Sequence, residues 1–426
     1  MTTQVQFLES IFSAKGSDLR KFHNMARSVI IFDEAQSMPI KCIHLFNTAM
    51  NFINKVCNST ILLCTATQPP FEKVERKINF SETPSLTEYI ELPKRFKIIN
   101  SVTHKGYGYS ELKDFILEKY KQNKSILIIL NTKAAAKALF DELSSDDCEL
   151  KKEPDQLLHL STNMCSAHRN NVIARLRKRL DDKEPVICVS TQLIEAGVDI
   201  SFECVIRDIA GLDSIYQAAG RCNRHGEYEG AKEVYIINIE SENLERLPDI
   251  KIGAKITKRL IRENNGDLNS ADIINKYYHY YFQNQTQKNK MGYQLDGGET
   301  ICDLLSCNIK GCGNYKNSGN TTQVTLQCAI RSAAKEFYVI DKGRTEIIVY
   351  YENSKELLEQ FIKEKDITKK QKILKQLNKF SVSVYEYQLA ELKNKNAIDS
   401  NAYEGLLVLD KKFYDDKIGI NISSSH

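Results

Sequence analysis

The chain has 426 residues, of which 42% are hydrophobic and 27% are charged, and its net charge is +4 when the histidines are neutral. This length predicts two to four domains with sizeable apolar cores, and the composition is that of an ordinary globular protein. No signal peptide or apolar run of membrane-spanning length occurs, which argues against export and against a membrane partner. The small net charge neither requires nor excludes a polyanionic partner.

The twelve cysteines are scattered singly rather than grouped. Cys64 and Cys188 lie in apolar segments, where a free thiol behaves as a small hydrophobic side chain. Cys302, Cys307 and Cys312 are five residues apart and lack the C-x-x-C pairs of a structural zinc site. We therefore expect reduced thiols and a cytoplasmic protein.

Residues 1–95 contain two short apolar runs, at 28–32 and 60–64. Continuous apolar runs of this length are typical of parallel strands that are covered on both faces. Only two such runs are present, so they predict the last strands of a larger parallel sheet. Unpaired edges of such a sheet expose apolar surface and favour association.

Residues 96–240 alternate between apolar runs and helical patterns, which predicts a complete doubly wound α/β lobe. The expected strands are 125–130, 157–160, 186–189, 204–207 and 233–237. The expected helices are 110–121, 133–143, 167–180 and 213–219.

The remaining sequence has a different character. Residues 241–290 are helical and rich in tyrosine, which predicts a helical linker. Residues 291–426 mix short strands such as 346–350 with a charged helix at 354–377, and 311–320 has the composition of a loop. We expect a C-terminal accessory domain there.

Asp33 and Glu34 directly follow the first apolar run, so they emerge at the carboxyl end of a strand, where α/β sheets place ligands. One carboxylate could hold a magnesium ion that bridges nucleotide phosphates, and the other could activate water. Thr65 and Thr67 follow the second run, and their hydroxyls could link the acidic pair to the cleft. Taken alone, Asp33 and Glu34 would more often be an acidic strand end in solvent, and Thr67 would more often be an N-cap or turn residue.

Two further threonines, Thr132 and Thr191, follow strands of the second lobe. Their hydroxyls could contact a nucleic-acid phosphate, although N-capping of the next helix is the alternative. Gly197 allows close approach of a nucleotide, and Asp199 could accept from a ribose hydroxyl.

Gln217 precedes Arg221 and Arg224, and the two arginines are three residues apart. Arginine donates in a rigid charged fork that suits a γ-phosphate across a domain cleft. Pairing with acidic strand ends is the alternative. The phosphate-loop pattern G-x-x-x-x-G-K-[ST] does not occur in the sequence.

In this order the motifs closely resemble the CRISPR-associated helicase-nuclease of type I interference systems, a superfamily-two helicase. The similarity is firm over residues 1–240 and loose beyond. It is carried by Ile31-Phe32-Asp33-Glu34-Ala35-Gln36, Cys64-Thr65-Ala66-Thr67-Gln68-Pro69, residues 160–169, residues 190–199, residues 212–216, and Gln217-Ala218-Ala219-Gly220-Arg221-Cys222-Asn223-Arg224.

The resemblance implies two RecA-like lobes, the first incomplete over 1–95 and the second complete over 96–240, then a linker over 241–290 and an accessory domain over 291–426. It also implies ATP and Mg²⁺ as cofactors. The implied catalytic residues are Asp33 (also the metal ligand), Glu34, Gln217, Arg221 and Arg224. The implied nucleotide-site residues are Gln36, Thr65, Thr67, Gly197 and Asp199, and the implied strand contacts are Thr132 and Thr191.

The family couples ATP hydrolysis to 3′-to-5′ movement along single-stranded DNA displaced by an RNA-guided surveillance complex, and an HD nuclease degrades the strand. The HD domain and the phosphate loop have no counterpart in this sequence. We therefore expect the rear part of such a helicase, which needs a separate N-terminal half as partner. The alternatives are a non-catalytic fragment that binds single-stranded nucleic acid or the surveillance complex, and another superfamily-two helicase.

Overall fold

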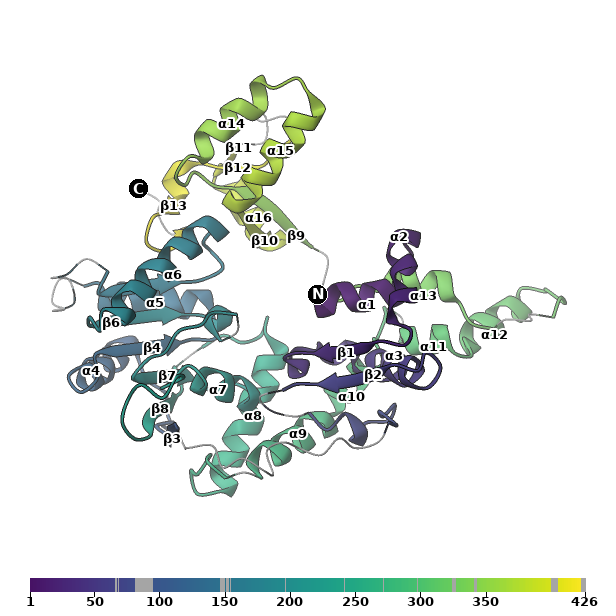
Figure 1. The fold of residues 1–426 in the computed structure, drawn as a ribbon, viewed down its shortest axis with the longest axis horizontal. Coiled ribbons are helices and arrows are strands. Elements are labelled where there is room, and N and C mark those ends of the chain that lie inside the picture. Colours follow the sequence, from purple (N-terminus) through teal and green to yellow (C-terminus); the bar gives the residue numbers. More distant parts are fainter. Residues whose placement is uncertain are drawn as a thin grey trace. The chain divides into compact units, whose positions relative to one another are not determined.

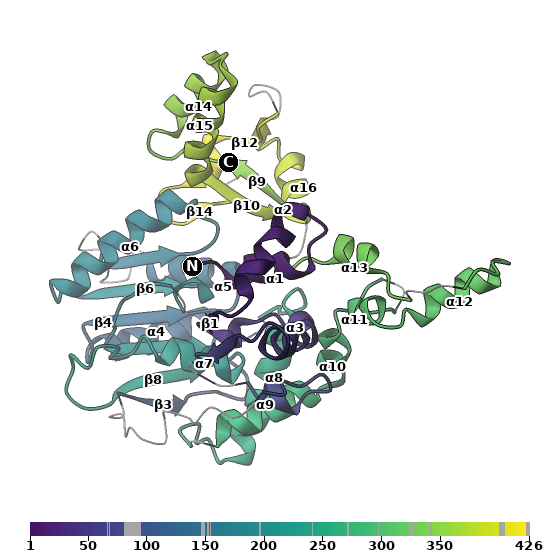
Figure 2. The same cartoon turned by 45° about the vertical axis from the view of Figure 1, so that its right-hand side comes forward.

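The computed structural model divides the chain into two compact units, which are drawn in Figures 1 and 2. The first unit combines Met1–Leu92 with Ala271–Lys342, and the second combines Pro93–Ser270 with Gly343–His426. The residues described are 1–65, 67, 69–80, 95–145, 150, 153, 155–195, 197–240, 242–270, 272–296, 298–323, 327–340, 343–399 and 405–422. The division differs from the one expected from the sequence, because 271–342 pack with the first unit and 343–422 pack with the second.

The second unit is built around a six-stranded, all-parallel sheet with the strand order β3-β8-β7-β4-β6-β5 (Figure 2). Its strands are β3 (Phe96–Asn100), β4 (Ser125–Ile129), β5 (Leu157–Leu160), β6 (Val186–Ser190), β7 (Cys204–Asp208) and β8 (Lys232–Ile237). Its helices are α4 (Tyr109–Tyr120), α5 (Lys133–Leu143), α6 (Ser166–Asp181), α7 (Leu212–Ala219) and α8 (Pro248–Glu263). This is the doubly wound lobe predicted from the alternation of strands and helices, with β3 as a strand that the sequence did not reveal.

The centre of the sheet is dry on both faces. Every residue of β4 is buried, and Ile126 and Ile128 pack with side chains of α4 and α5 on one face. Leu127 faces the opposite way, because strand side chains alternate, and it is fully buried too. The continuous apolar runs of the sequence therefore correspond to strands covered on both sides. Their carboxyl ends all meet at one edge of the sheet.

The first unit holds a parallel pair of strands, β1 (Val29–Phe32) and β2 (Thr60–Leu63). Phe32 packs edge-on against Phe7 and Phe46, with ring centroids 4.9 and 5.1 Å apart. The other face of the pair is open, since Val29 is 70% exposed and Ile31 is 62% exposed. The sequence predicted strands covered on both faces, and the described residues cover only one.

Helices make up the rest of the first unit. They are α1 (Gln4–Phe12), α2 (Gly16–Leu19), α3 (Ile43–Lys55), α9 (Ile273–Gln283), α10 (Gln285–Met291), α11 (Ile301–Leu305), α12 (Ile309–Asn317) and α13 (Ile330–Glu336). The prediction of a loop at 311–320 is wrong, because Asn308 accepts a side-chain hydrogen bond from the Gly311 amide and starts α12. Within the described part of the chain, every helix is too short or too polar to span a lipid bilayer.

Residues 343–422 form an accessory subdomain of the second unit. Its elements are β9 (Arg344–Ile348), α14 (Ser354–Lys363), α15 (Ile367–Leu377), β10 (Ser381–Tyr385), α16 (Glu386–Asn394), β11 (Ile398–Asp399), β12 (Val408–Leu409), β13 (Tyr414–Asp415) and β14 (Gly419–Ile420). The expected single helix over 354–377 is two helices, because Asp366 adopts an extended backbone and caps α15 through the amides of Thr368 and Lys369.

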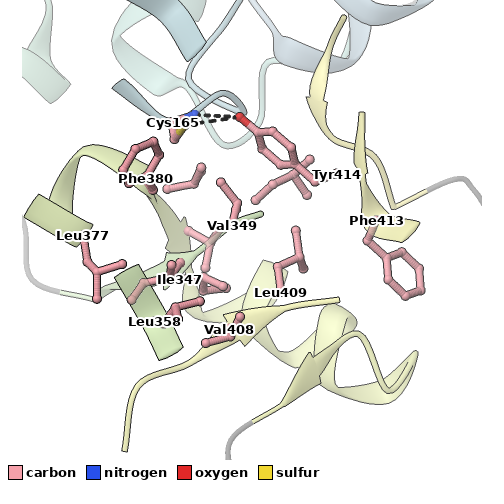
Figure 3. Packing of buried hydrophobic residues seen from close by; sticks show 14 of the residues in the cluster. Cys165, Ile347, Val349, Leu358, Leu377, Phe380, Val408, Leu409, Phe413 and Tyr414 are labelled. Atoms are coloured by element: carbon pink, nitrogen blue, oxygen red, sulfur yellow. Dashed lines mark hydrogen bonds between the residues drawn. The ribbon is translucent and has the colours of Figure 1, made fainter. Parts of the chain in front are cut away.

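The accessory subdomain shares its core with the RecA-type lobe, as Figure 3 shows. Cys165, at the start of α6, lies against the buried cluster that contains Ile347, Leu358 and Phe380. The hydroxyl of Tyr414 accepts a hydrogen bond from the Cys165 amide at 3.1 Å. Its oxygen also lies 3.0 Å from Nδ1 of the buried His168. This continuous apolar and hydrogen-bonded contact makes the subdomain part of the lobe.

One glycine fixes the closest approach in this contact. Gly419 has φ +79°, and a Cβ there would lie 2.6 Å from the carbonyl carbon of Asn163. We expect Gly419→Ala to destabilise the subdomain by about 1–2 kcal/mol of left-handed strain plus about 1–3 kcal/mol of overpacking. Hydrogen exchange should then accelerate in β13, β14 and the segment 161–165.

The matched control is Gly405→Ala, since Gly405 also has positive φ (+87°) but meets no described atom within 4 Å. It should show the backbone strain without the collision, and therefore a smaller loss of stability. Equal effects of the two substitutions would contradict the role of close packing against Asn163.

Candidate nucleotide and nucleic-acid sites

Asp33 and Glu34 lie at the carboxyl end of β1, exposed to solvent. Glu34 has φ +54°, so the chain turns sharply away from the strand at this residue. The amide of Ala35 donates to the carbonyl oxygen of Cys64 at 3.1 Å, which ties the segment that follows β1 to the one that follows β2. The structure therefore places Asp33, Glu34 and Thr65 at the same edge of the strand pair.

Two glutamines hold this acidic segment. The Nε2 of Gln4 donates to the carbonyl oxygens of Asp33 and Glu34 at 2.7 and 3.2 Å. The Nε2 of Gln36 donates to a carboxylate oxygen of Glu34. A cavity of about 340 Å³ is lined by Asp33, Glu34 and residues of α1. Gln36 thus hydrogen-bonds directly to the Glu34 carboxylate. The sequence did not predict the hydrogen bonds from Gln4 to this segment.

Thr67 has a different environment from Thr65. Thr67 is 5% exposed, and its hydroxyl lies 2.9 Å from the hydroxyl of Tyr278 on α9. Thr65 is only partly buried. Thr67 therefore links the segment after β2 to α9, a contact between residues far apart in sequence.

Asp33 can be tested as a ligand for Mg²⁺. Its Oδ1 accepts the amide of Glu34 at 3.1 Å, and the residue is exposed to solvent. Among the described residues, no three His, Cys, Asp or Glu side chains form a metal-binding group. Magnesium commonly takes one or two protein carboxylates and completes its shell with phosphate oxygens and water. Asp33 fits such a single-carboxylate role.

In the second unit, Thr132 and Thr191 follow the neighbouring strands β4 and β6. The hydroxyl oxygen of Thr132 accepts the Ala135 amide at 3.1 Å and caps α5. A hydroxyl that accepts a hydrogen bond can still donate one of its own. Thr191 is 5% exposed, and Gln192 beside it donates to the carbonyl oxygen of Asn131 at 3.0 Å. The structure thus brings both threonines to one edge of the sheet.

Gly197 and Asp199 lie on the segment between β6 and β7. Gly197 has φ +75° and no described atom near its missing Cβ. The Oδ1 of Asp199 accepts from Nε of Arg224 at 2.8 Å and lies 3.4 Å from Nε2 of His225. The hydrogen bond from Arg224 lowers the pKa of Asp199. The pair is exposed and screened by water, so it can open readily when a ligand competes.

The two arginines of the finger segment are not equivalent. Arg221 is 6% exposed, and its guanidinium donates to the carbonyl oxygens of Ile194 and Glu195 at 3.1 and 2.7 Å. The side chain of Arg224 is 40% exposed. Gln217, on the last turn of α7, is partly buried. Arg224 therefore has the more accessible guanidinium, and Arg221 holds the carbonyl oxygens of Ile194 and Glu195 against α7.

A buried polar network centred on Arg207 also contacts the segment after β6, through Glu195. The sequence did not lead us to this network. Arg207 on β7 is fully buried, with Nε 2.9 Å from Oε1 of Glu195. Its Nη1 donates to Oδ1 of Asn131 at 2.7 Å, and its Nη2 donates to Ser214 at 2.9 Å. The signal was present as an arginine within an otherwise apolar strand. Its significance depends on partners 12 and 76 residues away in sequence (207 versus 195 and 131).

The network continues to a pair of carboxyl groups. Nδ2 of Asn131 donates to Oδ2 of Asp208 at 2.6 Å and to Oε2 of Glu242 at 3.1 Å. Burial, and then the negative charge of Glu242, raise the pKa of Asp208 well above its usual range. Burial also raises the pKa of Glu195, and Arg207 opposes this shift. The edge of the sheet is thus held by a buried, charge-assisted network.

A parallel six-stranded sheet with threonines at its strand ends and an arginine segment behind α7 defines a RecA-like helicase lobe. Residues 122–227 match the family model described as CRISPR-associated nuclease/helicase Cas3, C-terminal. The CRISPR-associated nuclease/helicase Cas3 of Methanothermobacter thermautotrophicus is 25% identical over 317 residues, which cover 71% of this chain and 37% of that protein.

Solved structures give the same result for the fold. T. fusca Cas3 with AMPPNP aligns with a TM-score of 0.63 at 15% identity, covering 96% of this chain and 53% of that one. A chain of a CRISPR RNA-guided surveillance complex in a pre-nicking state aligns with a TM-score of 0.59 at 14% identity, covering 96% and 56%. This chain therefore spans about half the length of these solved chains and just over a third of the curated relative.

These matches confirm the resemblance carried by the motifs. Together they support a CRISPR-associated helicase of superfamily two, with this chain similar to the C-terminal part of those proteins. The predicted RecA-like α/β fold class is confirmed as well.

Proposed function

We propose that this chain is the rear part of an ATP-dependent DNA translocase of type I CRISPR interference, and that it hydrolyses ATP only when a front part completes its first lobe. One solved structural neighbour, T. fusca Cas3, was crystallised with AMPPNP, with ADP and with ATP, which supports nucleotide use. The match to a chain of an RNA-guided surveillance complex supports such a complex as partner. The substrate in this proposal is single-stranded DNA.

The observation that carries this proposal is the open strand pair β1–β2. A parallel sheet of two strands is not expected to be stable by itself, because parallel sheets are normally buried on both faces. Here Val29 and Ile31 expose apolar surface on one face, while Asp33 and Glu34 stand at the carboxyl edge. Strands from outside residues 1–426, on the same or another polypeptide, would pair with the open edge of the sheet, and the helices that connect them would cover this face.

Completion of the sheet would also complete the nucleotide site. A phosphate loop between a strand and a helix holds phosphates with backbone amides and a lysine, and the supplied strands would carry it. Bound Mg²⁺ would neutralise charge on the β- and γ-phosphates. Asp33 would hold the ion, and Glu34, oriented by Gln36, would accept a proton from the attacking water.

The second lobe would contribute from its own edge. Arg224 would exchange its exposed bond to Asp199 for a γ-phosphate oxygen, since an arginine fork suits that anion. Thr132 and Thr191 would contact the backbone of the DNA strand. The segment 191–199 carries both Thr191 and Asp199, so a shift at the nucleotide side would be passed to the strand side.

The test is complementation. The purified chain alone should show no DNA-stimulated ATPase activity. Mixing it with the front part of a matching CRISPR-associated helicase, including its phosphate loop, should restore activity. Val29→Lys together with Ile31→Lys should abolish this restoration, because two charges would have to be buried against the front part.

The matched control is Ile330→Lys, which changes another exposed aliphatic residue of the same unit (60% exposed). It should leave restoration intact. ATP turnover by the chain alone that disappears in Glu34→Gln would contradict the need for a front part. Salt-sensitive binding of single strands without any restored ATPase would favour the second candidate, a binding fragment based on the complete second lobe.

A further inference from the structure

Helix α15 of the accessory subdomain carries an excess of lysines that packing of the subdomain does not explain. α14 and α15 form a helical hairpin at the end of the subdomain, as Figure 1 shows. Leu377 at the end of α15 is fully buried, and Phe380 just beyond it is 5% exposed. These two residues anchor the helix in the core drawn in Figure 3.

The segment 363–379 concentrates positive charge. It contains seven lysines and two carboxylates, a net charge of +5. The whole chain carries only +4, so the remaining residues together carry about −1. α15 itself has four lysines and no acidic residue.

Three of these lysines form one ridge on the solvent side of α15. Lys369, Lys372 and Lys375 are spaced three residues apart, and all three are exposed. Within the described residues, no ion pair involves their side chains. Residues three apart on a helix are neighbours, and like charges there repel. The ridge therefore destabilises the isolated helix slightly unless an anion binds to it.

The side chains beside the ridge can donate hydrogen bonds. Thr368, Gln371 and Gln376 are exposed on the same helix, so the surface offers ammonium, amide and hydroxyl donors. These groups are typical of contacts to phosphate oxygens. Exposed aliphatic residues are few here, mainly Ile367, and an 11-residue helix whose inner face is already packed has little apolar surface to insert into a membrane.

We propose that the lysine ridge of α15 is a nucleic-acid binding site that holds the phosphate backbone independently of sequence. It is distinct from the edge of the sheet that carries Thr132 and Thr191, and it requires neither nucleotide nor the front part of the helicase. Because the accessory subdomain shares its core with the lobe, nucleic acid bound there stays attached to the moving lobe.

The test uses the full chain and a fluorescein-labelled oligothymidine, with anisotropy measured over a series of salt concentrations. The triple variant Lys369→Gln, Lys372→Gln, Lys375→Gln should bind about tenfold more weakly at 0.1 M salt, and its log–log salt slope should fall by about 2 units. The loss should be equal for a mixed-sequence oligonucleotide. The melting temperature of the triple-variant protein should not fall, since the substitutions relieve like-charge repulsion.

The control triple Lys97→Gln, Lys255→Gln, Lys258→Gln removes the same charge from exposed positions of the same unit. It should keep most of the affinity and the slope. Equal losses in the two triples would show a general charge effect and overturn the proposal. Binding to phosphatidylserine vesicles that exceeds DNA binding and depends on the same ridge would also overturn it.

The outcome can be separated from that of complementation. Thr132→Ala with Thr191→Ala tests the edge of the sheet in the same assay without ATP. Loss of affinity in the α15 triple with no effect of the threonine pair would support the ridge and weaken the lobe's proposed strand contact. Loss of affinity in the threonine pair with no effect of the α15 triple would overturn the proposal for the lysine ridge and leave the proposed function unaffected.

Discussion

Glu34→Gln is expected to reduce ATP hydrolysis by the complemented helicase about 10²–10⁴-fold, the usual contribution of a general base. The amide keeps the shape of the side chain and its contact with Gln36 but cannot take the proton from water. Nucleotide binding should be nearly unchanged, because Asp33 keeps the metal-ligand role. The measurement is steady-state ATPase with saturating DNA, together with binding of a labelled ATP analogue.

The control for this prediction is Glu72→Gln, which neutralises another exposed carboxylate of the same unit. It should leave turnover unchanged. A Glu34→Gln protein that retains more than a tenth of the activity would remove Glu34 from the role of base.

Arg207→Met should destabilise the second lobe by about 3–5 kcal/mol, the usual cost of leaving the partner of a buried ion pair alone. Among the described residues, Glu195 (7% exposed) would keep Ser214 as its one side-chain partner, and Asn131 would lose a donor. Hydrogen exchange of the β6 and β7 amides, measured in the full chain, reports this loss because core strands open only with the lobe.

The double variant Arg207→Met with Glu195→Gln separates charge from packing. Replacing both members of a buried pair is far less costly than removing one, so the double variant should recover much of the lost protection. A double variant as unstable as the single one would show that the hydrogen bonds from Arg207 to Asn131 and Ser214, and not its charge pairing with Glu195, account for the loss.

The alternation of apolar runs and helical periods was enough to predict most of the second lobe. Strands at 125–130, 186–189 and 204–207 were predicted to within about two residues, because a strand buried on both faces must be apolar throughout. β3 was missed, since its edge position tolerates Lys97 and weakens the pattern. The split of 354–377 was missed because Asp366 looks like any helix residue until its backbone is seen.

The candidate site divides in the same way. Sequence order alone pointed to Asp33, Glu34 and the arginine segment, and those roles remain predictions. It could not distinguish Arg221, which holds two backbone carbonyls, from Arg224, which faces solvent. Nor could it show that Thr67 is joined to Tyr278, 211 residues further along the chain.

The sequence by itself determined the resemblance of this protein to a helicase family and the α/β order of its second lobe. Both depend on motifs and apolar runs, whose residues are close together in the sequence. Only the tertiary structure decided which of the family's residues face inward, that residues 343–422 share a core with the lobe, and that β1 and β2 leave one face uncovered. Burial and partner choice depend on contacts between distant residues, and one-dimensional order does not contain them.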